Sequence, residues 1–380
     1  MKIAIFTDTY LPQMNGVVSY LLDSIGELSK KHEIIVFAPG DKLKVEKKKV
    51  KTYWIPSSPF PFYEGYKIAS MNYARISELI KKENPDIIHA HAPVVLGVQG
   101  IICAKRRNIP LVITHHTHFP DYVPHLLNGK LPEAFEDMSG YTVKQLIKHV
   151  FTNADVVTAP TNELVKELRS YGLKNVVQLP NGVKLRKFKR NAKKGREFRE
   201  KLDIPQNKKV ILYLGRVSFE KKLEILLHAF SMIDNAYLVI AGKGPYLDDV
   251  KKLASALKIK NIRFTGFLKD EDIQGAYSAA DIFASPSDTE TFGLTFVEAM
   301  QSELPVVGVS KLGAKEIIED GKTGFLVAPG KARAFANALK KLLKNAALRR
   351  KFGRNGKERA KKYSLQNSIK RTEEIYGQVR

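Results

Sequence analysis

The feature that most constrains the fold of this chain is an alternation of two patterns along almost its whole length. Short runs rich in Val and Ile alternate with segments of about ten to fifteen residues that have helical periodicity. This alternation is typical of parallel strands joined by helical crossovers, so the sequence predicts an α/β fold. The predicted strands are Lys2–Phe6, Ile34–Phe37, Thr52–Ile55, Ile87–His89, Leu111–Thr114, Val156–Ala159, Val176–Leu179, Val210–Gly215, Tyr237–Ala241, Ile262–Phe264, Ile282–Ser285, Val306–Val309 and Phe325–Val327.

The alternation is interrupted once, at the basic and irregular stretch LPNGVKLRKFKRNAKKG, and restarts with the strand VILYLG. A chain of 380 residues also exceeds the size at which one hydrophobic core usually keeps growing. We therefore expect two doubly wound, Rossmann-like domains, residues 1–185 and 186–365, that face each other across a cleft.

The chain is strongly basic, with 63 Lys and Arg against 39 Asp and Glu and a formal net charge of +24. Such an excess favours an anionic partner, either lipid headgroups or a phosphorylated substrate, although a solvated lysine-rich surface accounts for it as well. Nucleic-acid binding is not expected, because it would need aromatic residues between the basic ones. The basic segment Lys340–Lys362 contains one aromatic residue, Phe352. One cysteine, no signal-peptide pattern and no apolar run of bilayer length predict a cytoplasmic protein.

Two basic residues follow the first strand of the second half, namely Arg216 and, five residues on, Lys221, which we expect to open the next helix. In doubly wound sheets ligands bind beyond the carboxyl ends of the strands. The planar guanidinium and the compact ammonium are suited to clamp a leaving diphosphate. The alternative is a pair of solvated charges at the start of a helix.

The segment SPSDTETFGLTFVEAM, residues 285–300, is the most informative in the chain. If a helix begins near Leu294, its first amides point toward any ligand of the preceding loop. Glu290 then lies in that loop and Glu298 about one turn inside the helix. Carboxylates accept hydrogen bonds from paired sugar hydroxyls, so one glutamate is suited to a hexose and the other to a ribose. Helix capping is the alternative role of both.

Other residues just after predicted strands are weaker candidates. Gly16 precedes a helix and permits close approach of a phosphate, and Gly244 of the AGKGPY turn permits the same for a ribose or base. Histidines follow two strands, but carboxylate or cysteine partners at metal-binding spacing are missing, so no metal site is predicted. The histidines concerned are His89, His91, His115, His116, His118 and His125.

The order of these motifs resembles the family 4 retaining glycosyltransferases, which have the GT-B fold, and the resemblance covers nearly the whole chain. It rests on Gly215 and Arg216 followed by Glu220 and Lys221, then GKGP, then two glutamates flanking TFGLTFV. The resemblance implies that the chain transfers a sugar from a nucleotide-sugar donor, with no cofactor and no essential metal. It also implies that the terminal helix, residues 366–380, packs on the first domain. Neither the sequence nor the resemblance predicts an oligomeric state.

The resemblance also assigns roles to single residues. Arg216 and Lys221 would hold the donor diphosphate, with Gly16 approaching it from the first domain and Gly244 lining the donor site. The transferred sugar would be held by Glu290, by His116, and by the amides of Phe292, Gly293 and Leu294, while Glu298 would hold the ribose. Which of His115, His116 and His118 faces the sugar stays open.

The string THHTHFPDYVPH is similar to the branch of the family that acts on diacylglycerol or related lipids. This implies that His118 and Tyr122 contact the acceptor and that the protein is peripheral on the inner face of the cell membrane. The segment Glu133–Lys148 would then be an amphipathic helix that docks on lipid through Lys144 and Lys148, or a domain helix with one wet face. We expect hexose transfer from UDP-glucose or GDP-mannose to a lipid hydroxyl, or alternatively to a soluble sugar phosphate or inositol phosphate.

Overall fold

The computed structural model describes residues 1–47, 50–60, 67–91, 93–116 and 133–380. The chain separates into two compact units, unit 1 with residues 1–182 and 365–380, and unit 2 with residues 183–364. The sequence placed the two boundaries at 185/186 and 365/366. Both units are α/β, and each has its own parallel sheet.

The sheet of unit 1 has the strand order β3-β4-β2-β1-β6-β7-β8-β9, with β5 paired to β4. Its pairs are parallel except those that β3 and β5 make with β4. The central strands carry Val and Ile at successive positions because both faces of a parallel sheet are covered by helices. The strands are β1 (Lys2–Thr7), β2 (Glu33–Gly40), β3 (Lys44–Lys47), β4 (Lys51–Pro59), β5 (Lys67–Ala69), β6 (Ile87–His91), β7 (Leu111–Thr114), β8 (Val156–Ala159) and β9 (Val176–Gln178).

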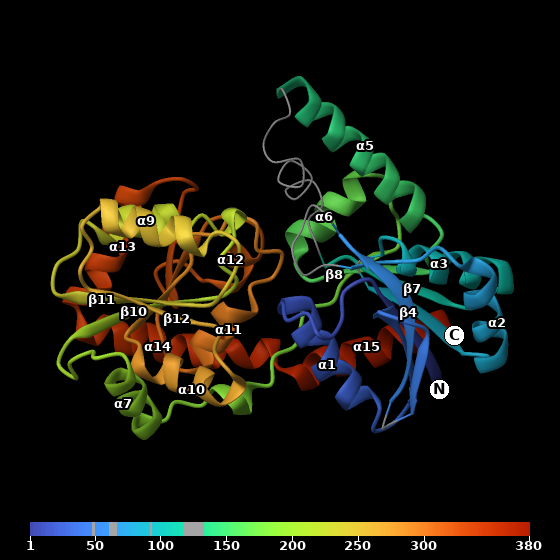
Figure 1. The fold of residues 1–380 in the computed structure, drawn as a ribbon, viewed down its shortest axis with the longest axis horizontal. Coiled ribbons are helices and arrows are strands. Elements are labelled where there is room, and N and C mark those ends of the chain that lie inside the picture. The colour runs from blue at the N-terminus through green and yellow to red at the C-terminus, as the bar shows by residue number, and fades with distance from the viewer. Residues whose placement is uncertain (48–49, 61–66, 92, 117–132) are drawn as a thin grey trace. The chain divides into compact units, whose positions relative to one another are not determined.

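Helices cover the two faces of this sheet in separate groups (Figure 1). Ile3 and Ile5 of β1 pack with α1 and with the last helix of the chain, α15. Phe6 points to the other face, where α3 approaches so closely that a Cβ on Gly100 would lie 2.6 Å from its ring. The helices are α1 (Gly16–Leu28), α2 (Tyr73–Glu83), α3 (Leu96–Arg107), α5 (Glu133–Phe151), α6 (Asn162–Ser170) and α15 (Leu365–Val379).

Unit 2 has a sheet with the order β12-β11-β10-β13-β14-β15, and its pairs are parallel. One core cluster joins Ile211 and Tyr213 to α8, α9 and α13, and another joins Val210 and Leu212 to α7, α10 and α11 (Figure 1). The elements are α7 (Ala192–Lys201), β10 (Lys209–Leu214), α8 (Leu223–Phe230), β11 (Ala236–Ala241), α9 (Leu247–Ala256), β12 (Ile262–Gly266), α10 (Asp270–Ala279), β13 (Ile282–Ala284), α11 (Leu294–Gln301), β14 (Val306–Val309), α12 (Leu312–Ile317), β15 (Gly324–Val327), α13 (Ala332–Lys344) and α14 (Ala346–Ala360), with the 3-10 turns η1 (Leu185–Phe188), η2 (Phe219–Lys221) and η3 (Lys361–Tyr363).

In both sheets the strand order reverses direction at the first strand of the unit. In unit 2, β11 and β12 follow on one side of β10, and β13, β14 and β15 lie on the other. In unit 1, β1 lies between β2 and β6 in the same way. Ligands of doubly wound proteins bind beyond the strand ends at such a switch point. The topology therefore directs attention to the loops after β10 and β13 in unit 2, and after β1 and β6 in unit 1.

The structure differs from the predicted elements in two places. The strands β3 and β5 were not predicted, because KVEK and KIA are short, contain lysine and lie at sheet edges, where no alternating apolar pattern is needed. Lys221 does not open a helix: it ends the turn η2, and Lys222 interrupts the backbone with a φ of 52° before α8 begins at Leu223.

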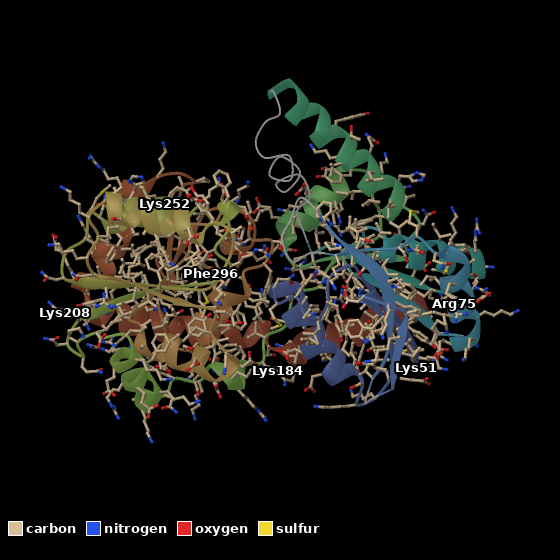
Figure 2. All side chains as sticks on the ribbon, viewed as in Figure 1. Lys51, Arg75, Lys184, Lys208, Lys252 and Phe296 are labelled. Carbon is tan, nitrogen blue, oxygen red and sulfur yellow. The ribbon has the colours of Figure 1, made fainter. Side chains whose placement is uncertain are left out.

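The positive charge is concentrated in unit 2. Residues 183–364 contain 38 Lys and Arg against 20 Asp and Glu, whereas unit 1 contains 25 against 19. Figure 2 shows lysines such as Lys208 and Lys252 at the rim of this unit and Phe296 inside it. Among the described residues, no helix is both long enough and apolar enough to cross a bilayer.

Candidate active site

The loops that follow β10 and β13 meet at the switch point of unit 2, and an ion pair joins them there. Lys221 Nζ lies 2.7 Å from Glu290 Oε1. Neither side chain is fully covered, since 14% of Lys221 and 23% of Glu290 is exposed, so both can reach a ligand. The structure thus brings together a cation and a carboxylate that the sequence assigned to the diphosphate and to the sugar of one donor.

Arg216 lies in the same β10 loop and is half-buried. The buried hydroxyl of Tyr213 donates a 2.8 Å hydrogen bond to the carbonyl oxygen of Arg216 and so fixes the turn that carries Arg216. Burial raises the pKa of Tyr213, with Lys221 acting in the opposite direction, so this phenol stays a donor at physiological pH. The loop that carries Arg216 is therefore held from within the core.

Helix α11 begins at Leu294, so the condition under which Glu290 lies in the preceding loop and Glu298 inside the helix is met. Gly293 is its N-cap, has a φ of 88° that suits glycine, and offers no side chain to the first amides. Phe292 is 2% exposed and its ring packs against Tyr363, so only its backbone is available to a ligand. The carbonyl of Glu290 accepts a 2.7 Å bond from the amide of Gly313, which anchors the loop at its other side.

Glu298 lies on the second turn of α11 and is half-buried. Its Oε2 accepts a 2.7 Å hydrogen bond from the hydroxyl of Tyr277, a residue of α10 that is fully buried. One carboxylate oxygen is therefore fixed from the core side. Tyr277 escaped the sequence analysis because nothing in its neighbourhood, QGAYSAA, distinguishes it from ordinary core packing.

In unit 1, the loop after β1 leads to α1, where Gly16 is exposed as the first helical residue. Asn15 caps this helix by accepting a 2.9 Å bond from the amide of Val18. In α3, Asp8 accepts bonds from the amides of residues 94–97 at 2.7–3.0 Å. A protein carboxylate thus satisfies the amino terminus of α3.

Two histidines of β6 and one that follows β7 lie close together. His116 Nε2 lies 2.9 Å from His91 Nδ1, and the ring of His91 lies 3.9 Å from that of His89. His89 bonds Tyr376 of α15 at 2.7 Å and Thr114 at 2.6 Å. Burial lowers the pKa of His91 and of His116 well below the usual range, and burial with the nearby His116 lowers the pKa of His89 to about 3. These imidazoles are neutral hydrogen-bonding groups at pH 7.

His115 and His116 differ in what they face. The ring of His115 packs edge-on against Phe151 of α5, while His116 packs against Tyr20 of α1 and stacks with His91. His118, Tyr122 and His125 lie outside the described residues. Which of His115, His116 and His118 faces the sugar therefore stays open.

Comparison with known proteins decides the family. Residues 14–187 match the model of Glycosyltransferase Family 4, and residues 194–359 match that of Glycosyl transferases group 1. Alpha-monoglucosyldiacylglycerol synthase of Streptococcus pneumoniae is 34% identical over 337 residues, covering 86% of this chain and 75% of that protein. The chain belongs to glycosyltransferase family 4.

Further relatives, and one solved structure, are similar over most of the chain. Alpha-monoglucosyldiacylglycerol synthase of Acholeplasma laidlawii is 27% identical over 99% of this glycosyltransferase and 96% of its own length. A GDP-mannose-dependent alpha-mannosyltransferase of Corynebacterium glutamicum is 26% identical over 86% of the chain and 76% of its own length. Anabaena HepE, solved with UDP-glucose, superposes with a TM-score of 0.80 at 19% identity over the whole of both chains. The predicted GT-B fold is confirmed.

Among the described residues of this glycosyltransferase, no three His, Cys, Asp or Glu side chains lie together as a metal site would require. The expectation that no essential metal takes part stays a prediction, which the function assay below addresses.

Gly244 proves to be a position of tight packing. A Cβ at this residue would lie 2.1 Å from the carbonyl oxygen of Val217, which itself accepts a bond from the amide of Tyr246. We expect Gly244→Ala to lower the free energy of unfolding by about 1–3 kcal/mol, measured by urea denaturation followed by circular dichroism, because backbone must move. In the control, Gly26→Ala, the new methyl meets open space on α1, and we expect stability to rise by up to about 1 kcal/mol. Unchanged stability of the Gly244 variant would contradict this reading.

Proposed function

We propose that this glycosyltransferase is retaining and moves a hexose from a nucleotide sugar, UDP-glucose or GDP-mannose, to a hydroxyl group of a membrane lipid. The observation that carries the proposal is the Lys221–Glu290 pair at the switch point of unit 2, beside the amino terminus of α11. The pair offers positive charge for a diphosphate and carboxylate oxygens for sugar hydroxyls within one hydrogen-bond length.

The donor would be held mainly by unit 2. Lys221, which donates to Glu290, and Arg216, with its planar fork, would both contact the diphosphate. The amides at residues 292–294 add the positive end of α11. Glu298, whose Oε2 is held by Tyr277, would accept from a ribose hydroxyl.

These groups would act chiefly in the transition state. As the bond between the anomeric carbon and the diphosphate breaks, negative charge grows on the leaving oxygen, and preorganised cations and amides stabilise it there more than in the ground state. In a same-face displacement that oxygen also takes the proton of the acceptor hydroxyl, so no enzymic nucleophile is required. The resemblance further implies roles for two residues of unit 1, with Gly16 at the diphosphate and the neutral His116 at a sugar hydroxyl.

A lipid acceptor is supported by the names of two relatives, both monoglucosyldiacylglycerol synthases, and by the surface of α5. On this helix Tyr141, which is 66% exposed, shares one face with the exposed Lys144 and Lys148, three and seven residues further on. An aromatic side chain beside cations is suited to the interface of an anionic bilayer. Membrane association at the inner face of the cell membrane follows from this proposal.

The experiment incubates the protein with UDP-glucose or GDP-mannose and either diacylglycerol in anionic vesicles or soluble inositol phosphate. We expect one donor to give an α-linked glycolipid, detected by mass spectrometry and by the anomeric coupling constant, and we expect EDTA to leave the rate unchanged. Vesicle sedimentation should weaken from low to high salt. Transfer to the soluble acceptor alone would replace the lipid proposal, and a β-linked product would exclude retention.

A further inference from the structure

Two adjacent lysines pair with two carboxylates of a different loop. Lys221 pairs with Glu290, and Lys222 Nζ lies 2.7 Å from Asp288 Oδ2. Between these ion pairs the hydroxyl of Thr289 donates a 3.4 Å bond to the carbonyl of Glu220. The loops after β10 and β13 are therefore joined at three successive positions.

The two ion pairs differ in depth. The side chain of Asp288 is 8% exposed, against 23% for Glu290, so Asp288 is the more deeply buried carboxylate, while its partner Lys222 is 32% exposed. A buried carboxylate needs a partner, because the loss of hydration is repaid only by a well-placed opposite charge. Lys222 serves a second acid as well: burial raises the pKa of Glu224, Lys222 lowers it, and Asp288 raises it again.

The backbone at Lys222 is unfavourable for lysine. Its φ of 52° and ψ of 40° lie in the left-handed region, which glycine and asparagine tolerate better. The residue also caps α8 without a side-chain bond to the helix. Neither the turn nor the helix explains a lysine here, whereas its ammonium bond to Asp288 does.

We propose that the Lys222–Asp288 pair is a positioning pair, which holds the loops after β10 and β13 in the register that sets Lys221 opposite Glu290. Both residues act through their neighbours and not on the donor. The proposal rests on the proposed function, in which Lys221 and Glu290 bind the nucleotide sugar.

The test uses Lys222→Gly, Lys222→Arg and Asp288→Asn, with Lys258→Gly as the matched control. Lys258 is a lysine of the same unit with a φ of 54°, but it is exposed and follows α9. Removing it relieves the same backbone strain without touching either loop. For each variant we would measure thermal stability, the Kd of the donor identified above by calorimetry, and kcat and KM at saturating acceptor.

We expect Lys222→Gly and Asp288→Asn each to lower kcat/KM by about tenfold, mainly through a higher KM, since misplaced binding groups weaken donor capture. Lys222→Arg should stay within about twofold of the wild type because it keeps the cation. The double variant Lys222→Gly/Asp288→Asn should lose no more than either single variant, because one interaction is removed in all three. Lys258→Gly should leave kcat/KM unchanged.

Several outcomes would overturn the positioning role. Wild-type kcat/KM in both Lys222→Gly and Asp288→Asn would do so, whatever their stability. So would an arginine variant as impaired as the glycine variant, since shape and not charge would then matter. Lys221→Ala, run in parallel, separates the two proposals: if it abolishes donor binding while the Lys222 and Asp288 variants bind normally, the proposed function stands and the positioning role falls. Should Lys222→Gly fold poorly, Asp288→Asn, which changes no backbone preference, decides the question.

Discussion

Lys221→Ala is expected to reduce kcat/KM for the nucleotide sugar by about 10²–10³-fold, the range found when one preorganised donor to a developing negative charge is removed. The side chain lies 2.7 Å from Glu290 and faces the end of β10. Its removal deletes a charge that the leaving diphosphate needs and leaves Glu290 without its partner. Initial rates over a range of donor concentrations measure the effect, and we expect kcat to fall along with kcat/KM.

Lys252→Ala is the control for this experiment. Lys252 belongs to the same unit, points to solvent with 80% of its side chain exposed, and makes only a loose 3.8 Å contact with Asp249 (Figure 2). We expect it to behave as the wild type, because an exposed ion pair of this kind contributes little. Glu290→Gln should resemble Lys221→Ala in size. A Lys221 variant that keeps more than a third of the wild-type kcat/KM would remove this residue from the donor site.

Acidification from pH 7 is expected to destabilise unit 1 steeply. In the folded state the pKa values of His89, His91 and His116 are all lowered, whereas in the unfolded chain each is near 6.5. Below pH 6.5 the unfolded chain therefore binds protons that the folded chain does not. The free energy of unfolding should fall by about 4 kcal/mol per pH unit, about 1.4 kcal/mol for each histidine. The stabilisation is complete above pH 6.5, and for His89 the loss continues to about pH 3.

Trp54, the one tryptophan of the chain, lies on β4 of unit 1 and reports its unfolding by fluorescence. Urea titrations at pH 7.0, 6.0 and 5.5 measure the slope. His91→Gln removes one of the three titrating groups, and we expect the slope to fall by about a third, whatever the variant costs at pH 7. A stability of unit 1 that does not change between pH 7 and 5.5 would show that these histidines accept protons in the folded state.

The sequence was a good guide to the sheets and a poorer guide to their edges and loops. The predicted strands are all present, because Val and Ile runs bounded by turns are the direct signature of a doubly covered parallel sheet. The edge strands β3 and β5 were missed, since an edge exposed to water requires no such run. The sequence also did not predict that η2 ends at Lys221. The next residue, Lys222, has a left-handed backbone conformation, which goes against the local propensity of lysine, and it is paired with the distant Asp288.

Some residues of the candidate site could likewise be named from the sequence and others could not. Arg216, Lys221, Glu290 and Glu298 could be named from the sequence because strand-end position and side-chain chemistry are both local. Their supporting residues could not: the pairings Lys222 with Asp288 and Tyr277 with Glu298 join positions 66 and 21 residues apart, and nothing local marks them.

The sequence by itself therefore determined the α/β class, two strand-and-helix units, the charge and the family, and it named the candidate ligand-binding residues. These depend on periodicity and composition, which are read along the chain. The tertiary structure alone decided which charges pair, which helix amino terminus Asp8 occupies, and that His91 of β6 and His116 after β7 are buried and neutral. Such properties depend on burial and on distances across a sheet, where residues remote in sequence exclude water from one another and set each other's protonation.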